Sequence, residues 1–423
     1  MSGRTDEDQA APSLGAAYSQ GSLRTQNLAL VAAHAFRSEQ RLSRAGLAEA
    51  TGLTRSTVSR LVGELVEARI LDELSPHEGR QGRPAIPLAP AARSIVGIGL
   101  EVSGGYLAGR AVDLRGAVLT ESIVHGRFEH SAPGPVLARL GDLLRGMSTG
   151  GALDGARIAG VNLALPGLVD PAAGRLLRAP NLGWDELHPE EYLGEGAMPE
   201  GVPLLVRNEA DLAAFAHSRS APGRPEPAST FFYVSGEIGV GAATVVNGAV
   251  SAGMRGWAGE IGHTLVDPAG PGCGCGARGC LEQYTGRDVL LERAGLPAGT
   301  TPGELADAAL AGSAPALQAV ERAGWALGIA LSGAVNLLDV HDVVLGGSFA
   351  PLFDLLRPPV EEQLRTRVLA SPWAEVHLRP AGDDSFPAVT GGAVAALETV
   401  ISAPATWMRA PSTVAPPTMA WQG

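Results

Sequence analysis

The sequence predicts an α/β protein in which an N-terminal winged helix-turn-helix precedes a larger body of two lobes with a cleft between them. Two observations support this class. Residues 23–90 show the apolar spacing of helices and then of a hairpin, whereas the residues after Pro90 alternate strand-like and helical runs. A length of 423 residues also leaves room for about two to three domains of roughly 150 residues each.

Composition excludes several classes of protein. Apolar residues make up 45% of the chain, enough for a large core. No uncharged apolar run reaches the length of a membrane span, and the polar, acidic N-terminus does not resemble a signal peptide. Three cysteines do not suggest a secreted disulfide framework. We therefore expect a soluble, cytoplasmic protein without a membrane partner.

Charge is distributed unevenly along the chain. The formal net charge is −12, yet residues 23–90 carry nine arginines against seven acidic residues, which leaves −14 for the rest. This asymmetry permits a DNA-binding head on an acidic body, although +2 is a modest charge. All basic residues are arginine and none is lysine. A bias in genome composition is the first explanation for this preference, before any role in binding phosphates.

Residues 23–70 predict three helices, at 23–37, 44–51 and 55–70. Ser43 and Thr54 can cap the second and third helices. The apolar face of the first helix consists of Leu28, Val31, Ala32, Ala35 and Phe36. A short helix, a turn at Gly52 and a longer helix match a helix-turn-helix, whose second helix enters the major groove N-terminus first.

The first two turns of the third helix carry residues suited to DNA. These residues are Arg55, Ser56, Thr57, Ser59 and Arg60. Their side chains can reach phosphates and base edges, with arginine preferring guanine. An ordinary helical hairpin with a solvated polar face is the alternative interpretation.

Residues 70–90 alternate apolar positions around a Gly/Arg tip, as a β-hairpin wing does. Arg80 and Arg83 in this tip are candidates for contacts with the DNA backbone or a narrow minor groove. A surface loop without DNA contacts is the alternative. Three helices followed by a wing are more specific for DNA binding than either part alone.

The body is expected at residues 93–402. Strand-like runs at 158–165 and 342–348 alternate with helices such as the one at 315–338. Residues 1–22 and 403–423 have the composition of disordered tails.

All three cysteines lie within eight positions, and a histidine precedes them. Cys273, Cys275, Cys280 and His263 offer three sulfurs and one nitrogen, a donor set that suits tetrahedral Zn²⁺. The surrounding glycines allow the backbone to wrap around an ion. A redox pair usually has Cys-x-x-Cys spacing, whereas the first spacing here is Cys-x-Cys. We therefore predict a structural zinc site, because four protein ligands leave no open position.

Residues 258–284, AGEIGHTLVDPAGPGCGCGARGCLEQY, resemble the signature of the ROK family of sugar kinases and sugar-responsive transcriptional regulators. NLALPGLVDPAAGRLLRAPNLGW at 162–184, VRNEADLAA and VVLGGS are similar in order and spacing. The resemblance covers roughly residues 93–402. Together with the winged head, it points to the repressor branch of xylose- and N-acetylglucosamine-type regulators.

The resemblance implies an actin-like, two-lobed sugar-kinase-type body with a sugar in the cleft. The effector-binding positions that it implies are Gly167, Asn181, Asn208, Glu209, Glu260, His263 and Glu282. Carboxylates, an amide and an imidazole can pair with the vicinal hydroxyls of a sugar. Such a site rejects ligands that lack those hydroxyls, since its buried polar groups would then stay unpaired.

Three positions depart from the pattern of the family's kinases. Glu101-Val102-Ser103-Gly104-Gly105 replaces the phosphate loop Asp-x-Gly-Gly-Thr, Glu237 stands in the second phosphate loop, and Glu209 replaces the catalytic aspartate. Carboxylates near a triphosphate are repulsive. We therefore expect neither phosphotransfer nor ATP binding. A sugar kinase with an appended DNA-binding domain is the alternative, and a regulator controlled by a protein partner is a third possibility.

These expectations combine into a sugar-responsive repressor that binds double-stranded operator DNA as a homodimer or higher oligomer. A sugar that closes the lobes would displace the two heads relative to half-sites about one helical turn apart.

Overall fold

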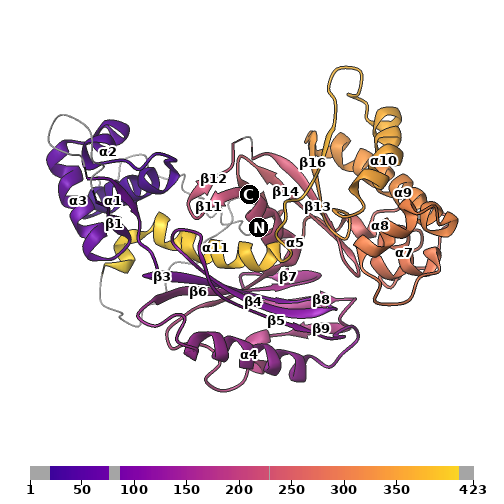
Figure 1. Cartoon of the computed structure of the whole chain (residues 1–423), viewed down its shortest axis with the longest axis horizontal. Coiled ribbons are helices and arrows are strands. Elements are labelled where there is room, and N and C mark those ends of the chain that lie inside the picture. Colours follow the sequence, from indigo (N-terminus) through magenta and orange to yellow (C-terminus); the bar gives the residue numbers. More distant parts are fainter. Residues whose placement is uncertain (1–19, 76–85, 228, 409–423) are drawn as a thin grey trace, which may run out of the picture.

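The structure is a computed structural model that describes residues 20–75, 86–227 and 229–408. A helical head is followed by two lobes, each built on a five-stranded sheet (Figure 1). This is the α/β architecture that the sequence predicts, with a winged head in front of a two-lobed body. Within the described ranges, no helix combines the length and apolar character that a membrane crossing requires.

Local capping signals define the helices of the head. The helices are α1 (Gln20–Arg37), α2 (Arg44–Thr51) and α3 (Arg55–Glu67). The Ser43 hydroxyl accepts a hydrogen bond from the Gly46 N–H, and the Thr54 hydroxyl accepts one from the Thr57 N–H. Each cap satisfies a backbone donor that the first turn leaves free. Gly52, with φ of 70°, ends α2 in the left-handed conformation.

The wing is an antiparallel pair of strands. β1 (Leu71–Glu73) pairs with β2 (Leu88–Pro90), so that Leu71 lies opposite Pro90. Arg80 and Arg83, the expected minor-groove residues, lie outside the described residues.

Both ends of the described chain differ from the expected tails. α1 begins at Gln20, three residues before the expected start of the head. Residues 404–407, expected in a disordered tail, form the 3₁₀ helix η3 (Pro404–Trp407). The Arg157 guanidinium lies 5.5 Å from the centre of the Trp407 ring, and Trp407 packs against the apolar core of the head. This burial of a large aromatic ring orders the segment.

The two large sheets repeat one strand order. The first has the order β10-β6-β3-β4-β5 and the second the order β17-β16-β13-β14-β15. In each, the central strand pairs antiparallel with its hairpin partner and parallel with a later strand. The strands of the first sheet are β3 (Ile95–Val102), β4 (Tyr106–Asp113), β5 (Val118–His125), β6 (Arg157–Leu165) and β10 (Leu204–Asn208). Those of the second are β13 (Phe231–Gly236), β14 (Val240–Val246), β15 (Ala249–Ser251), β16 (Asp342–Gly347) and β17 (His377–Pro380).

Two smaller sheets complete the body. One is formed by β7 (Leu168–Asp170), β8 (Arg175–Ala179) and β9 (Trp184–Leu187), and the other by β11 (Arg219–Ala221) and β12 (Arg224–Pro225). Because β3 and β13 hold equivalent places in their sheets, the turns that follow them also correspond.

Two helices lie together between the large sheets, α5 (Glu209–His217) and α11 (Pro387–Ser402) (Figure 1). Glycines in β3 let α11 approach closely. A Cβ atom on Gly97 would lie 2.0 Å from the Ala393 carbonyl oxygen, and one on Gly99 would lie 1.8 Å from that of Val389. Only glycine fits at such a distance.

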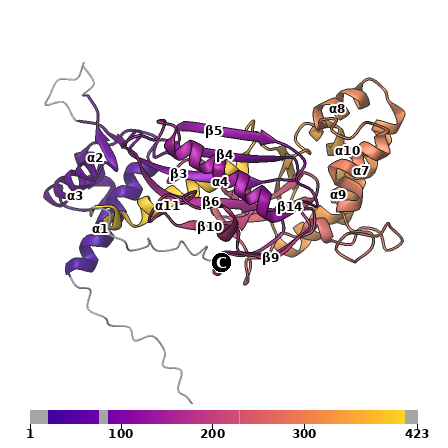
Figure 2. The ribbon, with the colours of Figure 1, turned by 90° about the horizontal axis from the view of Figure 1, so that it is seen from below.

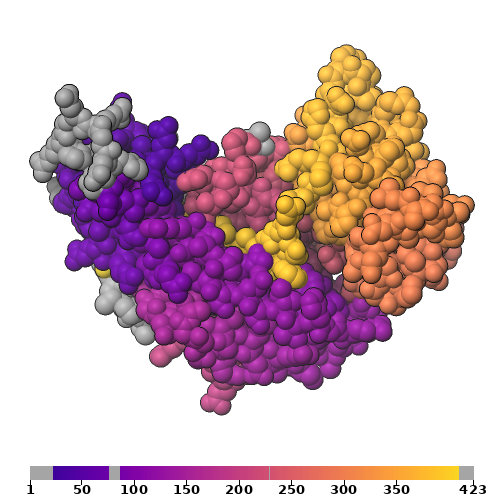
Figure 3. All heavy atoms as spheres, viewed as in Figure 1, coloured from indigo at the N-terminus to yellow at the C-terminus, as the bar shows by residue number. Residues whose placement is uncertain are grey.

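The outer helices cover the remaining faces. α4 (Pro133–Thr149) crosses the outer face of the first sheet (Figure 2). The second lobe carries the helices α6 (Glu282–Thr285), α7 (Arg287–Ala294), α8 (Pro302–Leu310), α9 (Ala314–Leu338) and α10 (Phe353–Arg367). Short 3₁₀ helices occur at η1 (Pro189–Tyr192) and η2 (Ile261–His263). The space-filling view shows the purple lobe and the orange-to-gold lobe as two masses that meet along a concave boundary (Figure 3).

The head and the body share one apolar core. Leu28 and Phe36 of α1 belong to the same buried cluster as Leu397, Val400 and Ile401 of α11. All five side chains are at most 4% exposed. The head is therefore packed against α11 rather than tethered to the body by a linker.

Candidate functional site

The three cysteines and His263 converge on one point. The ligand atoms of the four side chains lie within 4.8 Å of one another. His263 Nδ1 lies 3.8 Å from Cys273 Sγ, and Cys275 Sγ lies 3.7 Å from Cys280 Sγ. With Zn–S bonds of about 2.3 Å, sulfur ligands at tetrahedral angles are roughly 3.8 Å apart. The four side chains therefore form a possible metal site whose spacing fits a tetrahedral ion.

The local sequence explains how this loop folds. Gly276 has φ of 96°, and Gly279 has φ of 68°. A Cβ atom on Gly279 would lie 1.7 Å from the Asp267 carbonyl oxygen. Burial raises the pKa of the Cys273 thiol and raises that of Cys280 to about 12. A cation bound here therefore has to displace thiol protons, which makes its affinity depend on pH.

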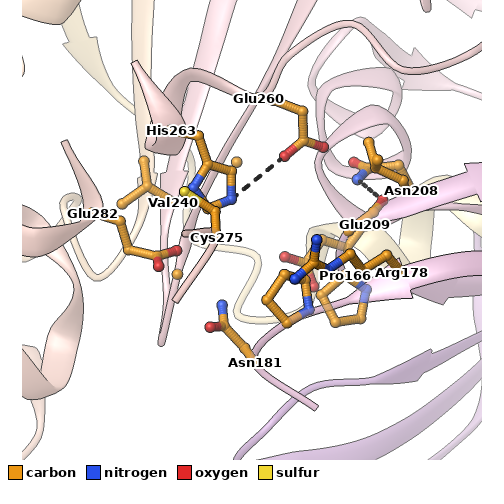
Figure 4. Close-up of a pocket in the computed structure, with 15 residues that line it drawn as sticks. Pro166, Arg178, Asn181, Asn208, Glu209, Val240, Glu260, His263, Cys275 and Glu282 are labelled. Carbon is orange, nitrogen blue, oxygen red and sulfur yellow. Dashed lines mark hydrogen bonds and ion pairs between the residues drawn. The ribbon is translucent and has the colours of Figure 1, made fainter. Parts of the chain in front are cut away.

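The effector residues expected from the sequence line one pocket of about 180 Å³ (Figure 4). They are Gly167, Asn181, Asn208, Glu209, Glu260, His263 and Glu282. The volume is below the range of about 300 to 1,000 Å³ that is typical of drug-sized ligands, so the pocket suits a small molecule. The chain brings these residues together from the turns after β6 and β8, the start of α5, η2 and α6.

His263 borders both the pocket and the cysteine cluster. Its Nδ1 atom faces Cys273, whereas its Nε2 atom lies 3.9 Å from Glu260 Oε2 (Figure 4). A metal ligand usually uses its second ring nitrogen to fix its orientation. This geometry leaves Nε2 on the pocket side, as the sequence expectation requires.

Asn208 is already engaged in local structure. Its Oδ1 atom accepts hydrogen bonds from the backbone N–H groups of Ala210 at 2.8 Å and Asp211 at 3.2 Å, and so caps α5. Its Nδ2 atom donates to the Gly167 carbonyl at 3.0 Å. One amide hydrogen therefore remains for a ligand. The contact with Gly167 also holds the β6–β7 turn, where φ of Gly167 is 89°.

The structure adds pocket residues that the sequence expectation missed. Arg178 of β8 lines the pocket, and so do Pro166 and Leu168. Arg178 lies within the quoted motif at 162–184, where its pairing with Leu168 in the β7–β8 hairpin places it beside the pocket. Gly239 also lines it, and a Cβ atom there would lie 2.3 Å from Asn181 Nδ2 and 2.5 Å from Glu282 Oε2.

The pocket carboxylates are partly buried. Burial raises the pKa of Glu209 well above its ordinary value, and the carboxylates of Glu101, Glu237 and Glu260 raise it further. Burial likewise raises the pKa of Glu260, with Glu282 adding to the effect and His263 opposing it. Carboxyl oxygens accept hydrogen bonds, which suits the donors of hydroxyl groups.

The three positions that depart from the kinase pattern meet at a second cavity of about 810 Å³. Glu101 comes from β3, Glu237 from the turn after β13 and Glu209 from the start of α5. Burial raises the pKa of Glu101 to about 8 and that of Glu237 to about 7. The Tyr106 hydroxyl donates a hydrogen bond of 2.9 Å to Glu101 Oε1. Glu101, Glu209 and Glu237 thus place three carboxyl groups on the wall of one cavity.

The expected DNA-contacting residues lie at the start of α3. Arg55, Ser56, Ser59 and Arg60 are exposed, and Thr57 is partly buried. The hydroxyls of Ser56 and Thr57 lie 3.0 Å and 2.9 Å from that of Thr54.

Arginines of the head differ in their freedom to bind a phosphate. Glu64 pairs with Arg60 at 2.9 Å and with Arg24 at 2.7 Å. A phosphate would have to compete with Glu64 for Arg60. No such pair is found for Arg55 in the described part of the chain.

A winged helix-turn-helix on a two-lobed, kinase-type body defines a transcriptional regulator. A model of the ROK family matches residues 98–399, and a model of the IclR helix-turn-helix domain matches residues 34–75. The chain belongs to the ROK family. The ROK family, which the sequence at 258–284 and the three other quoted motifs predicted, is therefore confirmed.

Relatives that match most of the chain are named as regulators. The chain is 26% identical over 341 residues to the xylose repressor of Bacillus subtilis, covering 80% of this chain and 87% of the relative. It is 27% identical over 341 residues to the DNA-binding transcriptional repressor Mlc of Escherichia coli, covering 78% and 82%. A glucokinase of Halalkalibacterium halodurans is 27% identical over 257 residues, covering 56% of this chain and 75% of the relative.

Solved structures support the same fold. A ROK family transcriptional regulator, described as a homologue of the Escherichia coli Mlc protein, superposes with a TM-score of 0.73 at 23% identity and covers 91% of this chain and 99% of its own. A ROK hexokinase from Thermus thermophilus superposes with a TM-score of 0.55 at 26% identity, covering 71% and 97%. The regulator thus matches the head and body together, and the hexokinase a smaller share of the chain.

Proposed function

We propose that this chain is a sugar-responsive repressor that binds operator DNA through α3 and the wing. A monosaccharide or a derivative occupies the pocket beside Glu260 and His263 and is not phosphorylated. The observation that carries the proposal is the pocket itself, in which the seven expected effector residues from several elements line one small space. The repressor names of relatives that match both head and body support the regulatory role.

We propose that the cysteine cluster holds Zn²⁺ as a structural ion. Cys273, Cys275, Cys280 and His263 would be its four ligands, and the ion would supply a fixed cross-link within the loop. His263, held at Nδ1, then keeps Nε2 directed to the pocket. Glu282, two residues after Cys280, is positioned by the same loop.

The absence of phosphotransfer is also part of the proposal. Glu101, Glu209 and Glu237 surround the neighbouring cavity, so a nucleotide triphosphate would meet buried carboxyls on several sides. The protein acts in the cytoplasm, as a homodimer or higher oligomer, since the helix-turn-helix of one chain reads one half-site.

The test uses the full-length protein and a panel of pentoses, hexoses and N-acetylhexosamines. We expect at least one sugar to raise the melting temperature of the wild type but not that of Glu260→Gln, with Glu190→Gln as the exposed control. The same sugar should change the affinity for a duplex selected from a random pool at least tenfold. A melting temperature unaffected by every sugar would favour control by a protein partner. Sugar-dependent ATP turnover that Glu209→Gln abolishes would favour the kinase alternative.

A further inference from the structure

The cavity next to the sugar pocket has a strongly acidic wall. Its volume of about 810 Å³ falls in the range of small-molecule sites. Five carboxyl groups line it, and Arg287 is the one basic residue among the residues that line it. Arg287 already pairs with Glu129 at 3.5 Å and with Asp288 at 3.3 Å. The acidic residues are Glu101, Glu209, Glu237, Asp383 and Asp384.

Three buried polar atoms on this wall have no hydrogen-bond partner. They are Glu101 Oε2, Ser348 Oγ and the Tyr233 hydroxyl oxygen, and the three residues are at most 4% exposed. All three atoms can accept a hydrogen bond. Buried polar groups are normally satisfied, so each such atom calls for an explanation. A ligand that donates hydrogen bonds here would satisfy all three.

The spacing of the carboxyls argues against a single metal ion. In the described ranges, which include all five acidic residues, the group of side chains close enough to share an ion is the His263–cysteine cluster. The acidic groups instead come from separate elements: β3, the turn after β13, the start of α5 and the segment before α11. Asp384 already pairs with Arg110 at 2.9 Å and accepts a hydrogen bond from the Phe386 N–H. A ligand that satisfies the other carboxyls must carry its positive charges on separated atoms.

We propose that this cavity binds a free di- or polyamine, whose ammonium groups lie against Glu101 of the first lobe and Glu237 of the second. An ammonium group carries three donors and no acceptor, which matches a wall of carboxyls and the Ser348 hydroxyl. The inference goes beyond the proposed function and does not depend on which sugar fills the neighbouring pocket.

Binding has a measurable proton signature. Burial raises the pKa of Glu101 to about 8, with Glu237 and Asp384 adding to the effect and Tyr106 and Arg110 opposing it. Burial raises the pKa of Glu237 to about 7, opposed by Arg287. At pH 7, Glu101 is mostly protonated and Glu237 is about half protonated, and an arriving ammonium group favours the ionisation of both. Amine binding should therefore release protons.

The experiment is isothermal titration of the full-length protein with spermidine, with putrescine and with MgCl₂ at physiological ionic strength. Titrations at pH 7 in two buffers of different ionisation enthalpy give the number of protons released. The variant Glu101→Gln/Glu237→Gln removes two carboxyls from the cavity. Glu190→Gln/Glu191→Gln removes two exposed carboxyls from η1 and is the matched control.

We expect one saturable site per chain for spermidine, with proton release. Affinity should fall at least tenfold in the cavity variant and stay within twofold in the control. The single variant Glu101→Gln should show an intermediate loss, and all variants should unfold cooperatively on heating as the wild type does, which shows that they fold. Equal losses in both double variants, or Mg²⁺ binding as tightly as spermidine, would overturn the proposal. The absence of a saturable site in the wild type would also overturn it and would leave the sugar-binding proposal untouched.

Discussion

At the scale of single residues, His263 shows how one side chain can serve two neighbouring sites. One ring nitrogen faces Cys273 and the other lies beside Glu260 in the pocket. A change in the cysteine cluster would therefore reach the pocket through the orientation of the His263 imidazole. The Cys275 side chain strengthens this link, since it lines the pocket as well as the cysteine cluster.

Cys275→Ser tests the metal side of this link. We expect the bound zinc to fall from one ion per chain to well below half, because a neutral serine hydroxyl replaces a thiolate ligand. The melting temperature shift caused by the sugar should shrink with it. Metal analysis by mass spectrometry and thermal unfolding measure the two effects. Arg278→Ala, an exposed change in the same loop, is the control and should retain its zinc. Full zinc occupancy in Cys275→Ser would contradict the assigned ligands.

Glu101 provides a prediction about pH. Burial raises its pKa to about 8 in the folded protein from the ordinary value of 4.5, so the folded state binds more protons between these pH values. Its contribution to stability is therefore fully present below pH 4.5 and is lost as the pH rises towards 8. Such a group lowers the free energy of unfolding by up to about 1.4 kcal/mol per pH unit in this window.

The measurement is urea unfolding of the wild type and of Glu101→Gln at pH 5, 6, 7 and 8. Glutamine cannot ionise, so the variant should lose less stability between pH 5 and pH 8 than the wild type. Glu190→Gln, on the surface, should follow the wild type. A variant that loses as much stability as the wild type would show that Glu101 does not hold a proton in the fold.

At the scale of elements, α5 joins the pocket to the head. The helix begins next to Asn208, which lines the pocket, and it ends at His217. The β11–β12 hairpin follows directly. Arg224 of this hairpin donates a hydrogen bond of 3.0 Å to the Ser38 carbonyl, just after α1. The chain thus runs from the pocket to the DNA-binding head through one helix and one hairpin.

This connection predicts that Arg224→Ala uncouples the two functions. Sugar affinity should remain within twofold of the wild type, because Arg224 does not line the pocket. The sugar-induced change in DNA affinity should fall at least threefold, since one contact between hairpin and head is lost. Fluorescence anisotropy with and without sugar measures the coupling, and Glu226→Ala in the same segment is the exposed control. Unchanged coupling in Arg224→Ala would assign the signal to another contact.

At the scale of the whole molecule, features that depend on neighbouring residues were predictable from the sequence, whereas contacts between distant segments were not. The caps Ser43 and Thr54 and the helix bounds at 44–51 were readable because each signal lies within a few residues. The hydrogen bonds from Arg157 to the Trp407 carbonyl and from Arg224 to the Ser38 carbonyl span 250 and 186 positions. The periodicity of a single sequence gives no information about such long-range pairs.

The candidate site shows the same division. The cysteine cluster was predictable because its ligands lie close together in the sequence, with a donor set typical of zinc. The pocket positions around Asn208 and Glu260 came from the family resemblance, and their contacts with sugar stay a prediction. Arg178 was missed although it lies in the motif at 162–184, because the sequence does not show which side chains of the β7–β8 hairpin face the pocket.

The core shared by head and body leads to a prediction about unfolding. Leu397 of α11 is fully buried in a cluster that includes residues of the head. Leu397→Ala should lower the free energy of unfolding by about 2–5 kcal/mol. The loss should also reduce protection of α3 amides in hydrogen exchange, since α3 packs in that cluster. Leu310→Ala, at a side chain 71% exposed, should leave both measurements unchanged. Full protection of α3 in Leu397→Ala would show that the head folds on its own.

The packing of α1 against α11 also limits how such regulators can be recombined. A chimera that exchanges only the first 90 residues would place a foreign α1 against Leu397, Val400 and Ile401 of the host. The contact between Phe36 and the β11–β12 turn, where a Cβ atom on Gly223 would lie 2.9 Å from Phe36 Cβ, would be mismatched as well. Because α11 also packs against β3 and α5 of the body, it cannot be moved with the head, and a foreign α1 has to match the α11 of the host. A new DNA specificity is most easily acquired by changing the exposed residues of α3 while the contacts between α1 and α11 are kept.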